Sequence, residues 1–236
     1  MEIKLMSFNT QHCLNYLEQK IDYDVMVNAI KSCGAEIIGL NEMRNKGEAE
    51  DYEAQTEILA NRLGYYHYFA KAIDFEGTNP YGNSLISKYP ILSAKTVLIP
   101  EPKVRKYDGY YEDRCLLLAE LDINGQRVNV MVIHFGLNPD EAENAVKAIT
   151  DNLPDGKVIL MGDFNLPPES ELLLPIKEKL FDTATLFGEN KLSYPSDDPY
   201  IKIDYIFLSR NIKAVSADIP EIIASDHRPH TATIEI

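Results

Sequence analysis

Short apolar runs alternate along the chain with segments whose apolar residues recur at helical spacing. Near the start, Ile3–Phe8 has the length and composition of a strand, and residues 22–32 place apolar side chains on one face of a helix. Gly34 suits the end of that helix, and Glu36–Glu42 is a second apolar run that ends in a carboxylate. The pattern therefore predicts strand, helix and strand, with a polar residue at the end of each strand.

The remaining pattern predicts three more helices among many strands. The helices are expected at Glu48–Leu63, Asn138–Asn152 and Glu169–Leu180. Turns are expected at Asn79–Gly82 and at Asn124-Gly125, which is a hairpin signal. The strands are expected at Tyr65–Ala70, Asn83–Ser87, Ile91–Leu98, Leu116–Asp122, Arg127–Phe135, Val158–Met161, Ile201–Leu208 and Thr231–Ile236. No linker, low-complexity segment or repeat interrupts this series, so we expect one α+β domain over residues 1–236.

The stretch that follows the run Val158–Met161 is the first candidate for chemistry. Gly162 allows a turn, and Asp163 and Asn165 follow it two residues apart. A carboxylate and an amide are thus delivered at the end of a buried strand, on a loop held by a rigid scaffold, where functional groups often lie. The same residues are also common in ordinary strand-end turns, so this stretch alone leaves both interpretations open.

Composition narrows the function classes. The formal net charge of -14 disfavours tight, sequence-independent binding to long nucleic acids. No apolar run is long enough to cross a membrane, and the N-terminus lacks the pattern of a signal peptide, so we expect a cytoplasmic protein, with a secreted or periplasmic protein as the alternative if a leader was removed. The three cysteines stand far apart and have no metal-ligand spacing.

Polar residues gather at the ends of other predicted strands as well. They are Asn9, Glu42, His134, Asp163, Asn165, Asp226 and His227, with Asp204 just inside a strand. Hard oxygen ligands such as Glu42 suit Mg²⁺ or Mn²⁺, and a carboxylate such as Asp163 can orient and deprotonate a water molecule. An imidazole whose partner carboxylate favours its protonated form can stabilise developing negative charge. Metal-assisted hydrolysis of a phosphate ester needs these groups.

The set resembles the endonuclease/exonuclease/phosphatase superfamily, which has the deoxyribonuclease I-like fold. Fragments that are individually weak occur in the family's order from the first strand to the last. They are Ser7-Phe8-Asn9, Leu40-Asn41-Glu42, residues 82–91, Arg114 before a strand, residues 132–135, Gly162-Asp163-Phe164-Asn165, residues 203–207 and Ser225-Asp226-His227-Arg228-Pro229. The resemblance implies a four-layered α/β/β/α sandwich in which two mixed sheets pack face to face with helices outside.

The resemblance also implies a role for each matching residue. Glu42 would be the principal metal ligand, with Asn9 and Asp226 near the metal. Asp163 would activate water, with Asn165 beside it holding the phosphate. His227, paired with Asp204, and His134 would be the histidines of the site. Arg114 would support the phosphate, and Asn83 would be a structural or substrate-orienting amide.

Two departures and several alternatives remain. Gln11 stands where some members have an aspartate, and Ile133 precedes His134 where Asn-Thr is commoner, which leaves the number of metal ions open. Taken singly, Asn9 and Glu42 could cap turns and His134 could be a core histidine. Arg114 and Asp204 could be a structural charge pair, and Asp226-His227 could be a plain loop.

We therefore expect a Mg²⁺- or Mn²⁺-dependent hydrolase that cleaves a phosphodiester, with a small molecule or lipid head group favoured as the substrate. A nuclease or a phosphomonoesterase is the alternative within this class, and a non-catalytic module that binds a phosphate ligand is the alternative outside it. The loop Pro100–Asp113 is the one basic, tyrosine-rich patch in an acidic chain. Its Lys103, Arg105 and Lys106 are expected to contact substrate, although a solvated loop has the same composition.

Overall fold

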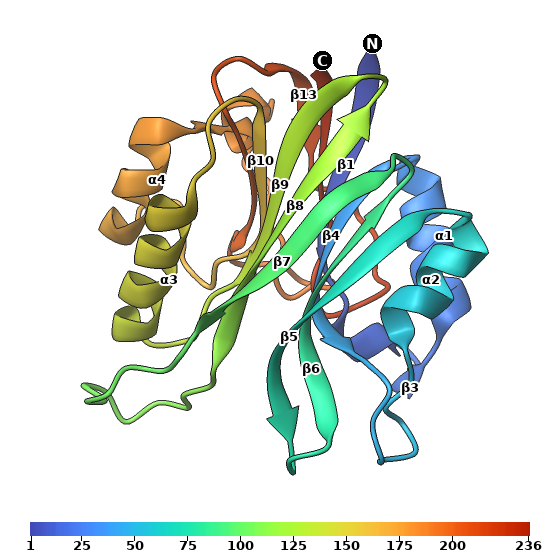
Figure 1. The fold of residues 1–236 in the computed structure, drawn as a ribbon, viewed down its shortest axis with the longest axis vertical. Coiled ribbons are helices and arrows are strands. Elements are labelled where there is room, and N and C mark those ends of the chain that lie inside the picture. The colour runs from blue at the N-terminus through green and yellow to red at the C-terminus, as the bar shows by residue number, and fades with distance from the viewer.

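The computed structural model describes all residues 1–236 as two six-stranded sheets packed face to face, with helices on both outer surfaces (Figure 1). The expected α+β sandwich is thereby confirmed. The helices are α1 (Tyr23–Cys33), α2 (Gln55–Leu63), α3 (Pro139–Asn152) and α4 (Leu174–Lys179). The strands are β1 (Glu2–Asn9), β2 (Leu14–Asn15), β3 (Lys20–Ile21), β4 (Ile37–Arg44), β5 (Tyr66–Phe75), β6 (Asn79–Ser87), β7 (Ile91–Ile99), β8 (Arg114–Ile123), β9 (Gln126–His134), β10 (Val158–Asp163), β11 (Phe181–Asp182), β12 (Asp204–Leu208), β13 (Lys213–Asp218) and β14 (His230–Glu235). None of the helices combines the length and the apolar character that a membrane span requires.

In both sheets the two central strands are parallel. The first sheet has the order β13-β14-β1-β4-β6-β5 and the second has the order β11-β12-β10-β9-β8-β7. The parallel pairs are β1 with β4 and β9 with β10, whereas their other neighbours are antiparallel. Parallel strands end at the same edge of a sheet, so each pair delivers its carboxyl ends together. Asn9 is opposite Asn41 in one sheet, and Asp163 is opposite His134 in the other.

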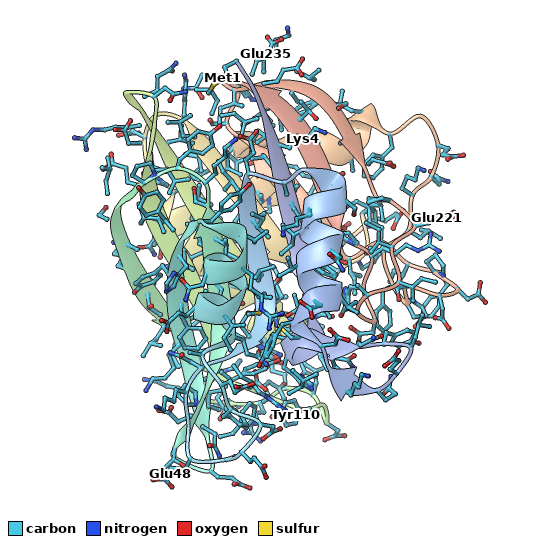
Figure 2. The ribbon with its side chains drawn as sticks, turned by 90° about the vertical axis from the view of Figure 1, so that its right-hand side faces the viewer. Met1, Lys4, Glu48, Tyr110, Glu221 and Glu235 are labelled. Carbon is cyan, nitrogen blue, oxygen red and sulfur yellow. The ribbon has the colours of Figure 1, made fainter.

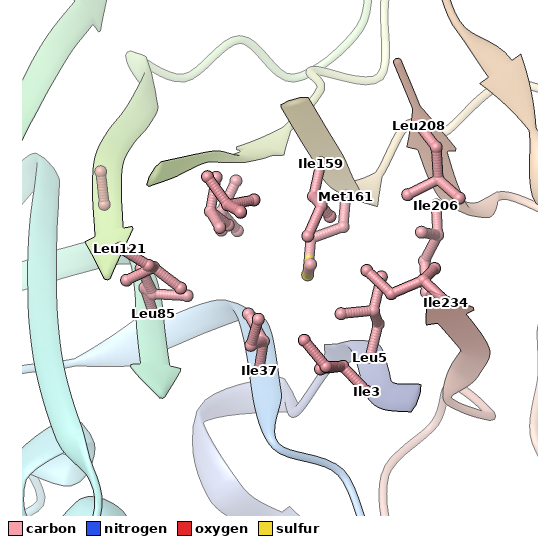
Figure 3. Packing of buried hydrophobic residues seen from close by; sticks show 14 of the residues in the cluster. Ile3, Leu5, Ile37, Leu85, Leu121, Ile159, Met161, Ile206, Leu208 and Ile234 are labelled. Carbon is pink, nitrogen blue, oxygen red and sulfur yellow. The ribbon is translucent and has the colours of Figure 1, made fainter. Parts of the chain in front are cut away.

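Three hydrophobic layers hold the four structural layers together. The central layer lies between the sheets and includes Leu5, Ile37 and Met161 (Figure 3). Helices α1 and α2 cover the outer face of the first sheet, and α3 covers that of the second, together with α4 (Figure 1). Because both faces of the central strands are buried, those strands read as nearly continuous apolar runs, which is the pattern found in the sequence.

The two ends of the sandwich are formed by different parts of the chain. Figure 2 places Met1 and Glu235 at one end and Glu48 and Tyr110 at the other. The carboxyl ends of the central parallel strands point away from the chain termini, so their polar residues lie toward the second end. The candidate site lies at this second end, where Tyr110 lines its pocket.

Two predicted helices are shorter than their sequence patterns indicate. The helix expected from Glu48 begins only at Gln55, because the backbone amides of Glu48 and Ala49 donate instead to the side-chain oxygen of Asn79. The helix expected over Glu169–Leu180 is a short 3-10 turn followed by α4, which spans six residues. In the first case, hydrogen bonds to a residue distant in the sequence replace those of the helix.

Some predicted strand boundaries were also wrong. Residues Asn79–Gly82 were expected to turn but belong to β6, and the turn lies just before them, where Glu76 and Gly77 have positive φ angles. The strand expected at Ile201–Leu208 begins only at Asp204. Strand β13 was not predicted because it is a mostly exposed edge strand without apolar alternation.

Candidate active site

Asp163 lies at the centre of the site, at the end of β10. Its side chain is buried, and its Oδ1 accepts a hydrogen bond of 2.9 Å from the backbone amide of Asn165. The preceding residue must be glycine, because a Cβ on Gly162 would lie 1.8 Å from the carbonyl oxygen of Ile133 on the neighbouring strand. The close strand packing and the tight turn thus fix the direction of the carboxylate.

Asn9 joins this carboxylate to the facing sheet. Its Nδ2 donates to Oδ2 of Asp163 and to Oε1 of Glu42, both at 3.0 Å. Its Oδ1 accepts from the backbone amide of Gln11 at 3.1 Å. With this side-chain orientation the amide nitrogen of Asn9 lies between two carboxylates and holds them in place.

Glu42 reaches the site through an irregularity in β4. The pairing with β6 shifts register between Leu40 and Met43, and Glu42 has a φ angle of 61°. A bulge with a left-handed residue redirects a side chain that would otherwise follow the strand alternation. The backbone of β4 thus aims the carboxylate of Glu42 into the cleft between the sheets.

Asn41, next to Glu42, is a buried residue to which the sequence analysis gave no role. Its Oδ1 accepts from the backbone amide of Asp163 at 2.9 Å, and its Nδ2 donates to Oδ1 of Asn83 at 2.8 Å and to the carbonyl of Ile133 at 2.9 Å. Asn83 in turn donates to the carbonyl of Cys115. Asn83 therefore acts inside the scaffold, where it holds Asn41 against the strand that carries Asp163.

His227 and Asp204 form a buried pair beside Asp163. The Nδ1 atom of His227 lies 2.9 Å from Oδ2 of Asp204, and its Nε2 lies 3.6 Å from Oδ2 of Asp163. Burial alone would lower the pKa of His227, but the carboxylates of Asp204 and Asp163 raise it to about 10. Burial raises the pKa of Asp163 to about 7, although the charge of His227 opposes that shift.

His134 and Arg114 complete the second sheet's contribution. The Nε2 atom of His134 lies 3.5 Å from Oδ2 of Asp163 and 3.3 Å from Nδ2 of Asn165. The Nδ1 atom of His134 lies 3.2 Å from the Nη1 atom of Arg114, so the ring must accept there and is neutral. Burial and the guanidinium of Arg114 hold the pKa of His134 well below its usual value.

These groups open into one pocket of about 390 Å³. The pocket is lined by Glu42, Tyr81, Tyr110, Glu112, Arg114, His134, Leu137, Asp163, Asn165, Tyr194, Ile203, Asp226 and His227. Seven of the residues picked from the sequence are thus brought together: Glu42, Arg114, His134, Asp163, Asn165, Asp226 and His227. Asn9, Asn83 and Asp204 lie behind them as hydrogen-bonding partners.

Lys103 and Arg105 lie elsewhere. Lys103 borders a separate hollow beside β7 and α3, and Arg105 pairs with Glu101 at 2.5 Å on the surface. The same loop contributes different residues to the pocket, namely Tyr110 and Glu112. Together with Tyr81 and Tyr194, these were missed because nothing in their spacing distinguishes them from other surface aromatics and acids.

The donor set fits a hard divalent cation. Glu42 and Asp226 offer carboxylate oxygens to the pocket, and no cysteine lines it. A tighter trio of Asp163, Asp204 and His227 has ligand atoms within 4.8 Å of one another. In that trio, however, Asp204 and His227 already face each other at hydrogen-bond distance, and Asp204 does not line the pocket.

Comparisons with known proteins agree with this fold. The family model described as Endonuclease/Exonuclease/phosphatase family matches residues 6–227. A family protein from Leptotrichia buccalis C-1013-b has a similar structure, with a TM-score of 0.77, 20% identity, and coverage of 99% of this chain and 100% of that one. The mannosyl-6-phosphatase Bt3783 of Bacteroides thetaiotaomicron VPI-5482 has a TM-score of 0.78 at 13% identity, with coverage of 99% and 100%.

A curated relative matches over a shorter stretch. Protein cwh43 of Schizosaccharomyces pombe is 26% identical over 109 residues, which is 46% of this chain. The aligned part is 10% of that relative's length. The match therefore concerns one segment of a much longer protein.

Proposed function

The chain belongs to the endonuclease/exonuclease/phosphatase family, and from this premise we propose that it is a metal-dependent phosphoesterase that cleaves a phosphodiester of a small molecule. Members of this family are hydrolases of phosphoester bonds. The observation that carries the proposal is the convergence of Asp163, His134 and His227 in one pocket, with each imidazole Nε2 within 3.6 Å of the same carboxylate oxygen.

Asp163 is proposed to orient and deprotonate the attacking water. Its Oδ2 faces the pocket between the two histidines, and its Oδ1 is occupied by the amide of Asn165. Oδ2 also accepts from Nδ2 of Asn9, so both oxygens are anchored and the remaining lone pair of Oδ2 is the one proposed to accept from the water. The side-chain amide of Asn165, held by the carbonyl of Phe135 at 3.0 Å, lies where it can position a phosphoryl oxygen.

His227 and Arg114 are proposed to stabilise negative charge on the phosphoryl group. Asp204 binds one ring nitrogen of His227, so the other nitrogen is a charged donor directed at the pocket. Arg114 is nine-tenths buried, which strengthens its interaction with an anion. His134 is neutral and keeps its ring between Arg114 and Asp163.

Glu42 and Asp226 are proposed to hold Mg²⁺ or Mn²⁺. When bound, such a cation neutralises charge on the phosphoryl and leaving oxygens. Asn9 keeps Glu42 and Asp163 a fixed distance apart, so the metal ligand and the base cannot collapse onto one another. The protein's own contribution is thus a preorganised set of oxygens and donors around a common centre.

A small substrate fits the pocket better than a long polyanion does. The volume of about 390 Å³ lies in the range of small-molecule sites. The formal net charge of -14 opposes approach of a nucleic acid. The similarity to a structure described as a mannosyl-6-phosphatase supports a small phosphate ester and keeps a monoester as the second candidate.

The test is hydrolysis of bis(4-nitrophenyl) phosphate beside 4-nitrophenyl phosphate, in Mg²⁺ or Mn²⁺ and with a chelator. We expect metal-dependent cleavage of the diester and a loss of kcat of about 10²–10⁴-fold in Asp163→Ala. Leu137→Ala, a change on the exposed rim of the same pocket, is the matched control. Turnover of the monoester alone would indicate a phosphatase, and metal-dependent phosphate binding without turnover of either ester would indicate a binding module.

A further inference from the structure

One wall of the catalytic pocket carries an acid that the proposed chemistry does not use. Glu112 lines the pocket but is only 8% exposed, and it comes from the segment that connects β7 and β8. Buried carboxylates are rare unless they are paired or bind a ligand. Arg114 pairs with Oε1 of Glu112, and Oε2 has no part in the proposed chemistry.

The start of α3 fixes this wall. The backbone amide of Glu112 donates to Oε1 of Glu141 at 3.2 Å, and Nδ2 of Asn138 donates to the carbonyl of Tyr110 at 2.8 Å. Asn138 and Glu141 form the capping box of the helix. A Cβ on Gly109 would lie 2.1 Å from Oδ1 of Asn138, so the segment packs closely on the cap. The wall is thus held rigidly, which a selective contact requires.

The carboxylate of Glu112 retains capacity to accept a hydrogen bond. Its Oε1 lies 2.9 Å from Nη1 of Arg114 as an ion pair, but that oxygen is buried and has no hydrogen bond of good geometry. Its Oε2 accepts from the hydroxyl of Tyr110 at 3.2 Å. Oε1 is closed to the pocket, so the acceptor position that remains for a donor there is the second lone pair of Oε2.

The surroundings indicate which donor fits. The guanidinium of Arg114 beside the carboxylate disfavours a second cation such as an ammonium group. Glu42 lines the same pocket as Glu112, so a second carboxylate acts on the same region. A further anionic group on the substrate is therefore also disfavoured, and a neutral hydroxyl remains.

The aromatic lining agrees with this choice. Tyr81, Tyr110 and Tyr194 all line the pocket, and Tyr110 is 59% exposed beside Glu112. Flat rings with polar edges suit an alcohol that has both apolar C–H faces and hydroxyl groups. A ring that carries several hydroxyls presents both kinds of surface at once.

We propose that Glu112 and Tyr110 select phosphoesters of a polyhydroxylated alcohol, because Glu112 accepts a hydrogen bond from a hydroxyl of the group attached to phosphorus. This inference rests on the phosphoesterase function proposed above. It assigns a specificity-determining role to Glu112, while Arg114 keeps its contact with the phosphoryl group.

The test uses two chromogenic diesters that differ only in hydroxyl groups, 4-nitrophenyl myo-inositol phosphate and 4-nitrophenyl cyclohexyl phosphate. The wild type should prefer the inositol ester about 10- to 100-fold in kcat/KM, the range of a hydrogen bond to a charged group. Glu112→Gln should reduce this preference to about threefold or less. The substitution can also move the side chain of Arg114. Such a movement affects both esters equally, because they carry the same phosphate, and therefore cancels in the ratio of the two kcat/KM values.

A second variant isolates the ring of Tyr110. Tyr110→Ala should lower the preference, whereas Tyr107→Ala should leave it unchanged, because Tyr107 is exposed in the same segment but does not line the pocket. Thermal unfolding of each variant shows whether it is folded. A Glu112→Gln variant that is unfolded is replaced by Glu112→Asp, which keeps the charge but shortens the reach and should reduce the preference.

Each outcome decides one of the two proposals. An equal preference in the wild type and in folded Glu112→Gln would overturn the role of Glu112 while the phosphoesterase stands. Preference for 4-nitrophenyl phosphorylcholine over the inositol ester would overturn the choice of a hydroxyl. If neither ester is hydrolysed, the proposed function fails. The affinities of the wild type and of Glu112→Gln for the same two esters, measured by calorimetry, then still decide whether Glu112 binds the hydroxyl groups.

Discussion

Two buried histidines on either side of Asp204 have opposite electrostatic environments. His227 lies on the pocket side and binds the carboxylate of Asp204 through Nδ1 at 2.9 Å. His230 lies on the scaffold side and binds the backbone carbonyl of Asp204 through Nδ1 at 3.1 Å, with Thr183 on its other nitrogen at 3.0 Å. The carboxylates raise the pKa of His227 to about 10 against the effect of burial, whereas burial lowers the pKa of His230 to about 3.

The comparison teaches that burial does not by itself mark a catalytic histidine. Both rings are nearly inaccessible, with exposed fractions of 4% for His227 and 0% for His230. The difference lies in the partner: a full charge holds a proton on one ring, and a neutral carbonyl and a hydroxyl satisfy the other ring without a charge. One aspartate thus contacts the pocket-side ring with its side chain and the scaffold-side ring with its backbone.

The largest expected effect comes from Asp204→Asn, which changes the side-chain contact to His227 and keeps the backbone contact to His230. The amide cannot hold the proton on His227, so we expect kcat for the diester to fall by about 10²–10⁴-fold. The backbone carbonyl of residue 204 is unchanged, so the contact to His230 should remain. The measurement is steady-state kinetics together with thermal unfolding of the same preparation.

Thr183→Val is the matched control on the scaffold side, because it removes the hydroxyl that contacts His230 and leaves His227 untouched. It should lower the unfolding temperature with little change in kcat. If the Asp204→Asn variant kept the wild-type kcat, or if Thr183→Val lost activity while folded, the division of roles between the two sides of Asp204 would be wrong.

A smaller effect is expected in the dependence of stability on pH. The folded-state pKa of His230 is about 3, below the unfolded value of about 6.5, so the folded state disfavours the proton. The contribution of His230 to stability is therefore complete above about pH 6.5 and is lost as the pH falls toward 3. Within that window the loss is about 1.4 kcal/mol per pH unit.

His230→Gln removes this titration while it keeps a polar side chain near Thr183. The variant is expected to be less stable than the wild type at pH 7, and the difference should shrink as the pH falls below about 6.5. Urea unfolding of both proteins between pH 7 and pH 4.5 gives the difference directly, since the titrations of the shared carboxyl groups cancel. A difference that is constant across this range would mean that His230 is protonated in the folded protein.

The sequence predicted the residues that line the pocket beside His227 better than the buried residues that support them. Asp163, Asp204 and His227 could be found because short ordered motifs surround them, and Asp163 also stands at the end of an apolar run. Asn41 could not be recognised, because its partners are the amide of Asp163 and the carbonyl of Ile133, which lie across the sandwich. Contacts between two sheets have no local signature.

The fold shows the same limit. Apolar runs buried on both faces were found as strands, but the edge strand β13 was not, because a mostly exposed strand lacks apolar alternation. The packing of two mixed sheets came only with the family resemblance, and the order of the strands within each sheet was not predicted. The loop Pro100–Asp113 was predicted to contact substrate through its basic residues, although its charged residue that lines the pocket is the acid Glu112.

The smallest expected effect comes from the exposed charges of the loop Pro100–Asp113. They contrast with the buried charge of His227. Arg105 pairs with Glu101 and stacks on the ring of Tyr111 at 5.0 Å, and Lys106 pairs with Glu143 at 3.5 Å, so both cations have partners on the surface. At 0.15 M salt, exposed charges beyond about 8 Å are largely screened. Combined charge reversal of Lys103, Arg105 and Lys106 should therefore change kcat/KM less than about threefold at that salt concentration, with a larger decrease at 0.01 M salt. A loss of tenfold or more at 0.15 M salt would return the loop to the substrate-contacting role that its composition suggested.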